Sequence, residues 1–196
     1  MTLTEQQQFV AHLQKEIDGI CKGKNLTALQ QSAFAFIIAY YTGMRPAEIA
    51  ALQMGDINFI DHEIKVNGTL TRGSEYKTVV GSQKTKNSFR TIYMPPIVEH
   101  SLMVYLEIYS KTEKHAPIKQ EYENFIFLSL RSGTLLEVAS LNFSFKKTLG
   151  NTVSDSKICQ YMLRHTFATN CYQYGIRDNT ISSILGHSKN GIILVF

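Results

Sequence analysis

The sequence predicts a mainly α-helical domain with one small antiparallel β-sheet, an α+β fold. Apolar residues recur every three or four positions over most of the chain, which is typical of helices. A few short stretches in the middle are instead rich in β-branched and aromatic residues and are separated by Gly, Asn and Ser. No repeat, low-complexity tract or linker-like stretch divides the 196 residues, so we expect a single domain over residues 1–196.

The expected helices follow the apolar spacing in chain order. The first begins near Thr4, where Gln7 completes a capping box. The second covers residues 26–41, and its later half is apolar nearly all round, which implies burial. A short third helix begins near Pro46, a residue that suits a first helical turn. Further helices are expected over residues 98–109, 141–149, 162–174 and 179–185, the last ended by Gly186.

The strands are expected between the third helix and the helix over residues 98–109. Residues 63–66 alternate polar and apolar side chains, and residues 76–80 and 89–94 are rich in Thr, Val, Tyr and Ile. We expect these stretches to form an antiparallel meander that ends at Pro95. Residues 124–130 form a further short extended apolar run.

Composition excludes several classes of protein. Apolar residues make up 44% of the chain, enough for a real core, so global disorder is excluded. The longest apolar run, residues 33–41, is far shorter than the about 20 residues of a membrane-spanning helix, and the start lacks the pattern of a secretory signal. Three scattered cysteines without a CxxC pair indicate neither a disulfide framework nor a thiolate zinc site. We therefore expect a soluble intracellular domain, whose net charge of +4 permits a polyanionic partner.

The first candidate site is the segment TGMRPAEIAAL at residues 42–52. Arg45 stands at a helix start, and Glu48 lies one turn later, where the two side chains can meet. A guanidinium beside the free N–H groups of a helix N-terminus favours a phosphate oxygen. The alternative is a surface arginine that only pairs with Glu48.

The second candidate site is the segment YMLRHTFAT at residues 161–169. Tyr161 and Arg164 lie three residues apart and share one helical face. Arg164 lies among apolar neighbours, so it requires an anion or an acidic partner. The alternative is an Arg–Asp pair inside the fold. His165 points elsewhere, and we expect it to orient its neighbours.

A histidine and a basic loop complete the candidate residues. His187 follows the Leu-Gly end of the last expected helix; the alternative is an ordinary core or capping histidine. The segment GSQKTKNSFR reads as a hairpin-like loop with three cations, Lys84, Lys86 and Arg90. A mobile lysine on such a turn can deliver a proton beside a bound phosphate, although most charge clusters of this kind are solvated turns.

Four segments in this order resemble the catalytic domain of the tyrosine recombinases, the phage integrase family: TGMRPAEIAAL, KTKNSFRTIYMP, LRHTFATN and LGHS. The resemblance covers nearly the whole chain. It implies the tyrosine-recombinase catalytic-domain fold and a reaction on double-stranded DNA that needs neither a metal ion nor a cofactor. In that reaction a tyrosine hydroxyl attacks a scissile phosphate to give a 3′-phosphotyrosine and a free 5′-hydroxyl, and the 5′-hydroxyl of a partner strand reverses the step.

The same resemblance implies a role for each candidate residue. Arg45 and Arg164 would clamp the phosphate, Lys84 (or Lys86) would protonate the leaving oxygen, and His187 would assist proton handling. Lys86 and Arg90 would contact DNA, whereas Glu48 and His165 would orient other groups. The resemblance also implies self-association, as a tetramer on DNA, a cytoplasmic and nucleoid-associated location, and no membrane partner. It does not separate phage integration from mobile-element transfer or a chromosomal role.

Two positions depart from the family pattern. Tyr161 replaces the usual histidine three residues before the second arginine, and a phenol can still hydrogen-bond a phosphate. Phe196 stands nine residues after His187, where the nucleophilic tyrosine is expected, and it lacks the reacting oxygen. We expect Tyr174, at helical spacing with core positions, to be buried and unable to substitute. The chain as written is therefore expected to be inactive, or to be a non-catalytic DNA-binding remnant of an integrase. The family's N-terminal core-binding domain and C-terminal tail helix are expected to be absent.

Overall fold

The computed structural model describes residues 1–20, 25–72, 78–82, 89–113, 116–149 and 159–186, with side chains described outside residues 72–88. Seven α-helices and five short strands make up this part of the chain, which confirms the predicted mainly α fold with a small antiparallel component. The helices are α1 (Leu3–Ile20), α2 (Ala28–Thr42), α3 (Pro46–Ile49), α4 (Pro96–Lys111), α5 (Val138–Leu149), α6 (Tyr161–Gln173) and α7 (Asp178–Leu185). The strands are β1 (Ile57–Asn58), β2 (Glu63–Val66), β3 (Gly68–Arg72), β4 (Thr78–Ser82) and β5 (Arg90–Tyr93). Two 3₁₀ turns, η1 (Met54–Asp56) and η3 (Gln120–Tyr122), lie in the connections.

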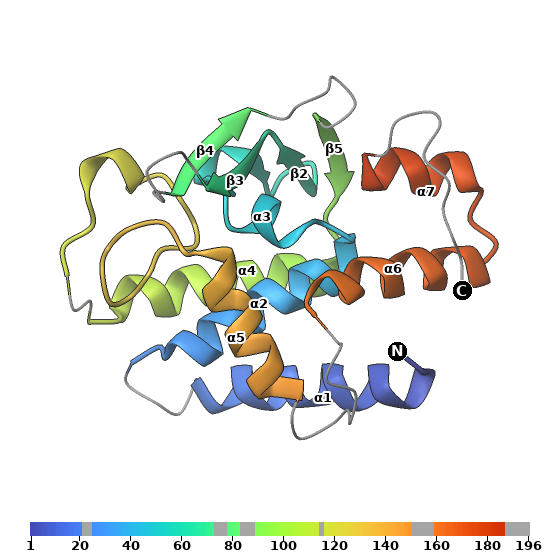
Figure 1. Ribbon diagram of the computed structural model, residues 1–196, viewed down its shortest axis with the longest axis horizontal. Coiled ribbons are helices and arrows are strands. Elements are labelled where there is room, and N and C mark those ends of the chain that lie inside the picture. The colour runs from blue at the N-terminus through green and yellow to red at the C-terminus, as the bar shows by residue number, and fades with distance from the viewer. Residues whose placement is uncertain (21–24, 73–77, 83–88, 114–115, 150–158, 187–196) are drawn as a thin grey trace.

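Helix α2 is the centre of the fold, in contact with α1, α4, α5 and α6 (Figure 1). Its N-terminus carries a complete capping box, in which Thr27 and Gln30 satisfy each other's backbone N–H groups. The helix ends at Gly43, whose φ of 67° is left-handed. Most of the α2 side chains between these ends are buried, as the apolar run predicts. The end of α2 is therefore fixed deep inside the molecule, and the candidate site is built there.

The strands form two ladders rather than one meander. A three-stranded sheet has the order β1-β2-β5, and a separate pair is β3-β4, all antiparallel. The first ladder ends at the pair Val66 and Arg90, and the second begins at Gly68 and Ser82. Only Asn67 separates the ladders on one side, whereas residues 83–89 separate them on the other. Lys84 and Lys86 thus belong to the segment that follows β4 and precedes β5 in the sequence.

Two expectations about local structure are wrong. The box at the start of α1 is formed by Thr2 and Glu5, since Thr2 N–H donates to Glu5 Oε2 at 2.7 Å and Thr2 Oγ1 accepts from the Glu5 N–H. The expected residues Thr4 and Gln7 lie inside the helix. Tyr174 is 86% exposed, because α6 ends at Gln173 and the helical spacing no longer applies beyond it.

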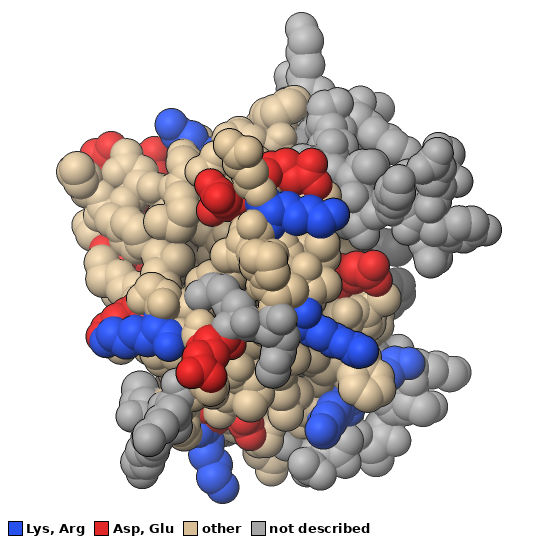
Figure 2. Space-filling view, turned by 90° about the vertical axis from the view of Figure 1, so that its left-hand side faces the viewer, with Lys and Arg blue, Asp and Glu red and all other residues tan. Residues whose placement is uncertain are grey.

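The space-filling view shows basic and acidic side chains interspersed over one face of the molecule (Figure 2). Among the described residues drawn there, neither sign of charge gathers into a patch. None of the described helices combines the length and the apolar character that crossing a membrane requires.

Candidate active site

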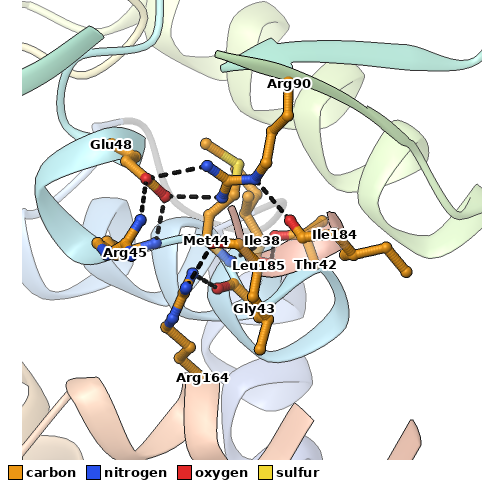
Figure 3. A network of polar contacts seen from close by, with 10 residues as sticks. All are labelled: Ile38, Thr42, Gly43, Met44, Arg45, Glu48, Arg90, Arg164, Ile184 and Leu185. Atoms are coloured by element: carbon orange, nitrogen blue, oxygen red, sulfur yellow. Dashed lines mark hydrogen bonds and ion pairs between the residues drawn. The ribbon is translucent and has the colours of Figure 1, made fainter. Parts of the chain in front are cut away.

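Three arginines from distant parts of the sequence converge at the C-terminal end of α2. Arg45 precedes α3, Arg90 begins β5, and Arg164 lies on α6 (Figure 3). Arg90 enters from the sheet and Arg164 from the helix on the opposite side in this view, with the Thr42–Met44 turn between them. The folding of α2, α6, α7 and the sheet around this turn brings the side chains together.

Arg45 is held by Glu48 at the start of α3. The Arg45 backbone N–H donates to Glu48 Oε2 at 2.7 Å, and Arg45 Nη1 donates to Glu48 Oε1 at 2.7 Å. Pro46 occupies the first helical position, where no N–H is needed. The Arg45 side chain is 30% exposed, whereas that of Glu48 is 1% exposed. The carboxylate therefore anchors one edge of a guanidinium that still reaches solvent.

Arg90 is bound to the same carboxylate. Its Nη1 donates to Glu48 Oε1 at 3.0 Å and its Nη2 to Glu48 Oε2 at 2.9 Å, while its Nε donates to the Ile184 carbonyl at 2.5 Å. Each Glu48 oxygen thus accepts one bond from Arg45 and one from Arg90. Burial alone would raise the pKa of Glu48, but the bonds and charges of Arg90 and Arg45 lower it below its usual value. Glu48 is therefore a buried anion.

The charge of Arg164 is stabilised differently, by backbone carbonyls at the ends of two helices. Its Nη1 donates to the Gly43 carbonyl at 2.8 Å and its Nη2 to the Leu185 carbonyl at 2.5 Å. Helices α2 and α7 both end in left-handed glycines, Gly43 and Gly186, and the C-terminus of a helix carries partial negative charge. No carboxylate of the described residues lies within ion-pair distance of this guanidinium, which is 2% exposed.

Burial of Arg164, together with the nearby charge of Arg45, lowers its pKa to about 10. This value is still well above neutral pH, so Arg164 is a buried cation. For Arg45, burial lowers the pKa, but Glu48 and the hydroxyl of Tyr161 together raise it above its ordinary value. The alternative interpretation of this position, an Arg–Asp pair, is not formed among the described residues.

Tyr161 and His165 lie at the edge of this cluster on the first turns of α6. The Tyr161 hydroxyl forms a hydrogen bond with the Arg45 side chain, which helps to raise the pKa of Arg45. Tyr161 is 39% exposed, and its ring meets that of His165 edge to face, with centroids 5.4 Å apart. His165 itself is exposed and contacts the cluster through Tyr161.

Five of the predicted site residues are thus brought together or adjoin one another: Arg45, Glu48, Tyr161, Arg164 and His165. Arg90 also lies in the cluster, where its guanidinium binds Glu48 and its side chain is 6% exposed. The predicted residues Lys84, Lys86, His187 and Phe196 lie outside the described residues. The backbone carbonyls of Gly43, Ile184 and Leu185 were not predicted, because a carbonyl is common to every residue type.

The cluster is suited to bind an anion. It holds three guanidiniums, of which Arg45 and Arg90 share the single carboxylate of Glu48, so these four described side chains carry a net charge of +2. Arginine recognises phosphate and carboxylate through its planar set of N–H donors. The described part of the chain contains no group of three or more His, Cys, Asp or Glu side chains that could hold a metal ion.

A sequence model of the phage integrase family matches residues 4–194, which is nearly the whole chain. The chain belongs to the phage integrase family. The tyrosine recombinase XerC-like protein of Caldanaerobacter subterraneus subsp. tengcongensis is 28% identical over 204 residues, covering 96% of this chain and 49% of that protein. The transposase of transposon Tn916 from Enterococcus faecalis is 27% identical over 166 residues, covering 81% of this chain and 40% of that protein. This integrase-family chain therefore spans half or less of the length of these curated relatives.

Solved structures of integrases and recombinases share the fold of this family member. The Tn1549 transposon integrase in complex with circular intermediate DNA superposes with a TM-score of 0.75 at 20% identity, over 97% of this chain and 57% of that one. The XerH site-specific recombinase bound to difH substrate, in a pre-cleavage complex, superposes with a TM-score of 0.60 at 21% identity, over 91% of this chain and 46% of that one. At these identities the likeness establishes a common fold, that of the tyrosine-recombinase catalytic domain.

Proposed function

We propose that residues 1–196 form a single catalytic domain of a site-specific recombinase, which breaks and rejoins double-stranded DNA through a 3′-phosphotyrosine. The observation that carries this proposal is the convergence of Arg45 and Arg164, 119 positions apart, on the turn after α2. Two guanidiniums that converge in this way suit the two non-bridging oxygens of one phosphodiester. Family membership supports the same assignment.

The charge of the cluster fits the chemistry of this step. A phosphodiester carries one negative charge, and a second develops as a nucleophile adds in line to phosphorus. The net charge of +2 of the cluster matches this developing charge, and its guanidiniums are preorganised by Glu48 and by the ends of α2 and α7. The hydroxyl of Tyr161 would donate a further hydrogen bond to the phosphate. The phosphotyrosine conserves the energy of the broken bond, so rejoining needs no nucleotide.

Proton transfer is assigned to residues that flank the cluster in the sequence. Lys84 or Lys86 would protonate the leaving 5′-oxygen; the segment that carries them is followed in the sequence by Arg90, which binds Glu48. His187 follows Gly186, the residue that ends α7 next to the Arg164 contact, and would assist the nucleophile. His165 would orient Tyr161. We further propose that the domain works on DNA in the cytoplasm, as part of a self-associated complex.

The nucleophile position holds phenylalanine, so we propose that the chain as written binds DNA without forming the covalent bond. Phe196 keeps the aromatic ring of a tyrosine and lacks the oxygen that attacks phosphorus. This observation also favours a second candidate function, a DNA-binding remnant that keeps the fold alone. The two functions differ in whether a tyrosine hydroxyl at position 196 would restore the formation of the covalent bond to DNA.

The test is the variant Phe196→Tyr, assayed with end-labelled nicked duplexes of randomised sequence, which trap a covalent adduct because the cleaved strand end diffuses away. We expect an SDS-resistant protein–DNA adduct with F196Y and none with the original chain. Adding Arg45→Ala to F196Y should reduce adduct formation by about 10² to 10³, the loss typical of one transition-state donor. The absence of an adduct with F196Y, together with salt-dependent duplex binding, would favour the non-catalytic function.

A further inference from the structure

Arg90 is a buried arginine for which the proposed chemistry has no direct use. Its side chain is only 6% exposed, and its three donor atoms Nε, Nη1 and Nη2 all bond to other parts of the fold (Figure 3). Two of them reach Glu48 on α3, and the third reaches the Ile184 carbonyl on α7. Arg90 therefore links α3, whose Glu48 binds Arg45, to α7, whose Leu185 carbonyl binds Arg164.

We infer that Arg90 is a positioning residue: it neutralises Glu48 so that Arg45 keeps its charge for the phosphate, and it fixes the last turn of α7 beneath Arg164. This inference deepens the proposed function and rests on it for the identity of the anion. It replaces the expectation that Arg90 contacts DNA directly.

Arg90 acts first on the charge of Glu48. Glu48 is buried and ionised. Its carboxylate accepts two bonds from the Arg90 guanidinium, at 3.0 and 2.9 Å, and only one from the Arg45 guanidinium, at 2.7 Å; the second Arg45 bond comes from its backbone N–H. Without Arg90, the carboxylate would have Arg45 as its remaining arginine partner, and the two would form a neutral pair. The charge available to an anion would then fall from two units to one. Arg90 thus acts on the anion without touching it.

Arg90 also binds the C-terminal end of α7. The last carbonyls of a helix have no partner within the helix. Two consecutive ones, those of Ile184 and Leu185, accept bonds from Arg90 and Arg164. A strand and a helix distant in sequence therefore cap α7 side by side. Loss of the Arg90 bond would free the turn that also fixes the Arg164 guanidinium.

The variants Arg90→Gln and Arg90→Lys separate positioning from direct DNA contact. Lysine can replace arginine as a point charge on a phosphate, but one ammonium cannot span both Glu48 oxygens and the Ile184 carbonyl. Tyr105→Phe is the matched control, because it removes a buried hydrogen bond to the Ile126 carbonyl, which lies outside the arginine cluster. All three variants are expected to lose stability, so stability alone does not decide the question.

Three measurements on the full chain decide it. Titration with inorganic phosphate, followed by the NMR signals of the arginine Nε–H groups, gives the anion affinity. We expect the phosphate affinity to fall about 10- to 100-fold in R90Q, the range found when a residue that orients a metal ligand is removed. The affinity should recover only in part in R90K, and it should be unchanged in Y105F. Hydrogen exchange of the Gly186 amide should accelerate in both Arg90 variants and not in Y105F.

The third measurement is the affinity of R90K for duplex DNA at one fixed salt concentration. R90K keeps the positive charge, so a direct phosphate contact would be preserved and the affinity unchanged, whereas a positioning residue loses affinity because lysine cannot span Glu48 and the Ile184 carbonyl. An unchanged DNA affinity in R90K, or an unchanged phosphate affinity and unchanged Gly186 exchange in R90Q, would overturn the inference. If phosphate shifts neither Arg45 nor Arg164 in the original chain, the proposed function is contradicted instead. The Gly186 exchange then decides the structural link on its own.

Discussion

Replacement of Gly43 by alanine tests how closely α2, α6 and α7 are packed around the arginine cluster. Gly43 has a φ of 67°, and its carbonyl accepts the bond from Arg164 Nη1. A Cβ added there would lie 2.5 Å from Phe167 Cδ1 and 2.7 Å from Leu185 Cδ2, far inside ordinary contact distance. Alanine would therefore strain the backbone and push α6 and α7 away from the end of α2.

The expected cost has two parts. A left-handed backbone costs an alanine about 1 to 2 kcal/mol, and overpacking a closed core costs about 1 to 3 kcal/mol. We therefore expect Gly43→Ala to lower the free energy of unfolding by about 2 to 5 kcal/mol. Gly175 is the matched control, since its φ is 76° and a Cβ there would meet nothing within 4 Å. Gly175→Ala should lose the backbone part alone, about 1 to 2 kcal/mol.

Urea denaturation of the three proteins, with the m-value checked for constancy, gives the comparison. Displacement of Phe167 and Leu185 should also weaken phosphate binding in G43A and leave it unchanged in G175A. Equal destabilisation of G43A and G175A would refute the reasoning, because it would mean that α6 and α7 move aside without cost.

Two further predictions concern Glu48 and Thr27. The pKa of Glu48 is lowered in the folded protein, so its stabilising contribution is complete above its usual value of 4.5 and is lost as the pH falls below it. Glu48→Gln should therefore lower the free energy of unfolding at pH 7 by about 3 to 5 kcal/mol, and its Tm should depend less on pH in acid. A curve of Tm against pH parallel to that of the original chain would contradict the ion-pair assignment. Thr27→Ala removes the N-cap of α2 and should cost about 1 kcal/mol, whereas Thr27→Ser, which keeps the hydroxyl, should cost much less in the same thermal melts.

The helices of this fold were predictable because their apolar spacing and end residues act locally. Gly186 ends α7 in a left-handed conformation, and Pro46 opens α3, as expected. The start of α1 was missed because two pairs fit the same capping pattern, Thr2 with Glu5 and Thr4 with Gln7. The pattern alone does not say which pair lies at the first turn.

The strands were only partly predictable, because pairing depends on residues distant in sequence. β3 was missed, since its sequence GTLTR has a single large apolar residue. β4 pairs with β3, whereas β5 pairs with β2, so the stretches read as one meander form two ladders. Residues 124–130 make only isolated bridges, such as Leu128 with Leu135.

In the candidate site, residue type identified the cations, but only one of their partners could be predicted. The pairing of Arg45 with Glu48 was predictable, because three residues separate them on one helical turn. The inward direction of Arg90 was not, since it depends on a carboxylate 42 positions earlier in the sequence. Likewise, Arg164 required a counter-charge, and the fold supplies it through backbone carbonyls rather than an acid.

The interruption between the two ladders makes their pairing independent. Asn67 alone joins β2 to β3, whereas residues 83–89 lie between β4 and β5 in the sequence. Insertions or deletions between Ser82 and Arg90 would shift neither register, because each ladder is paired separately. The number of residues there is therefore free to change while Arg90 keeps its bonds to Glu48 and to the Ile184 carbonyl.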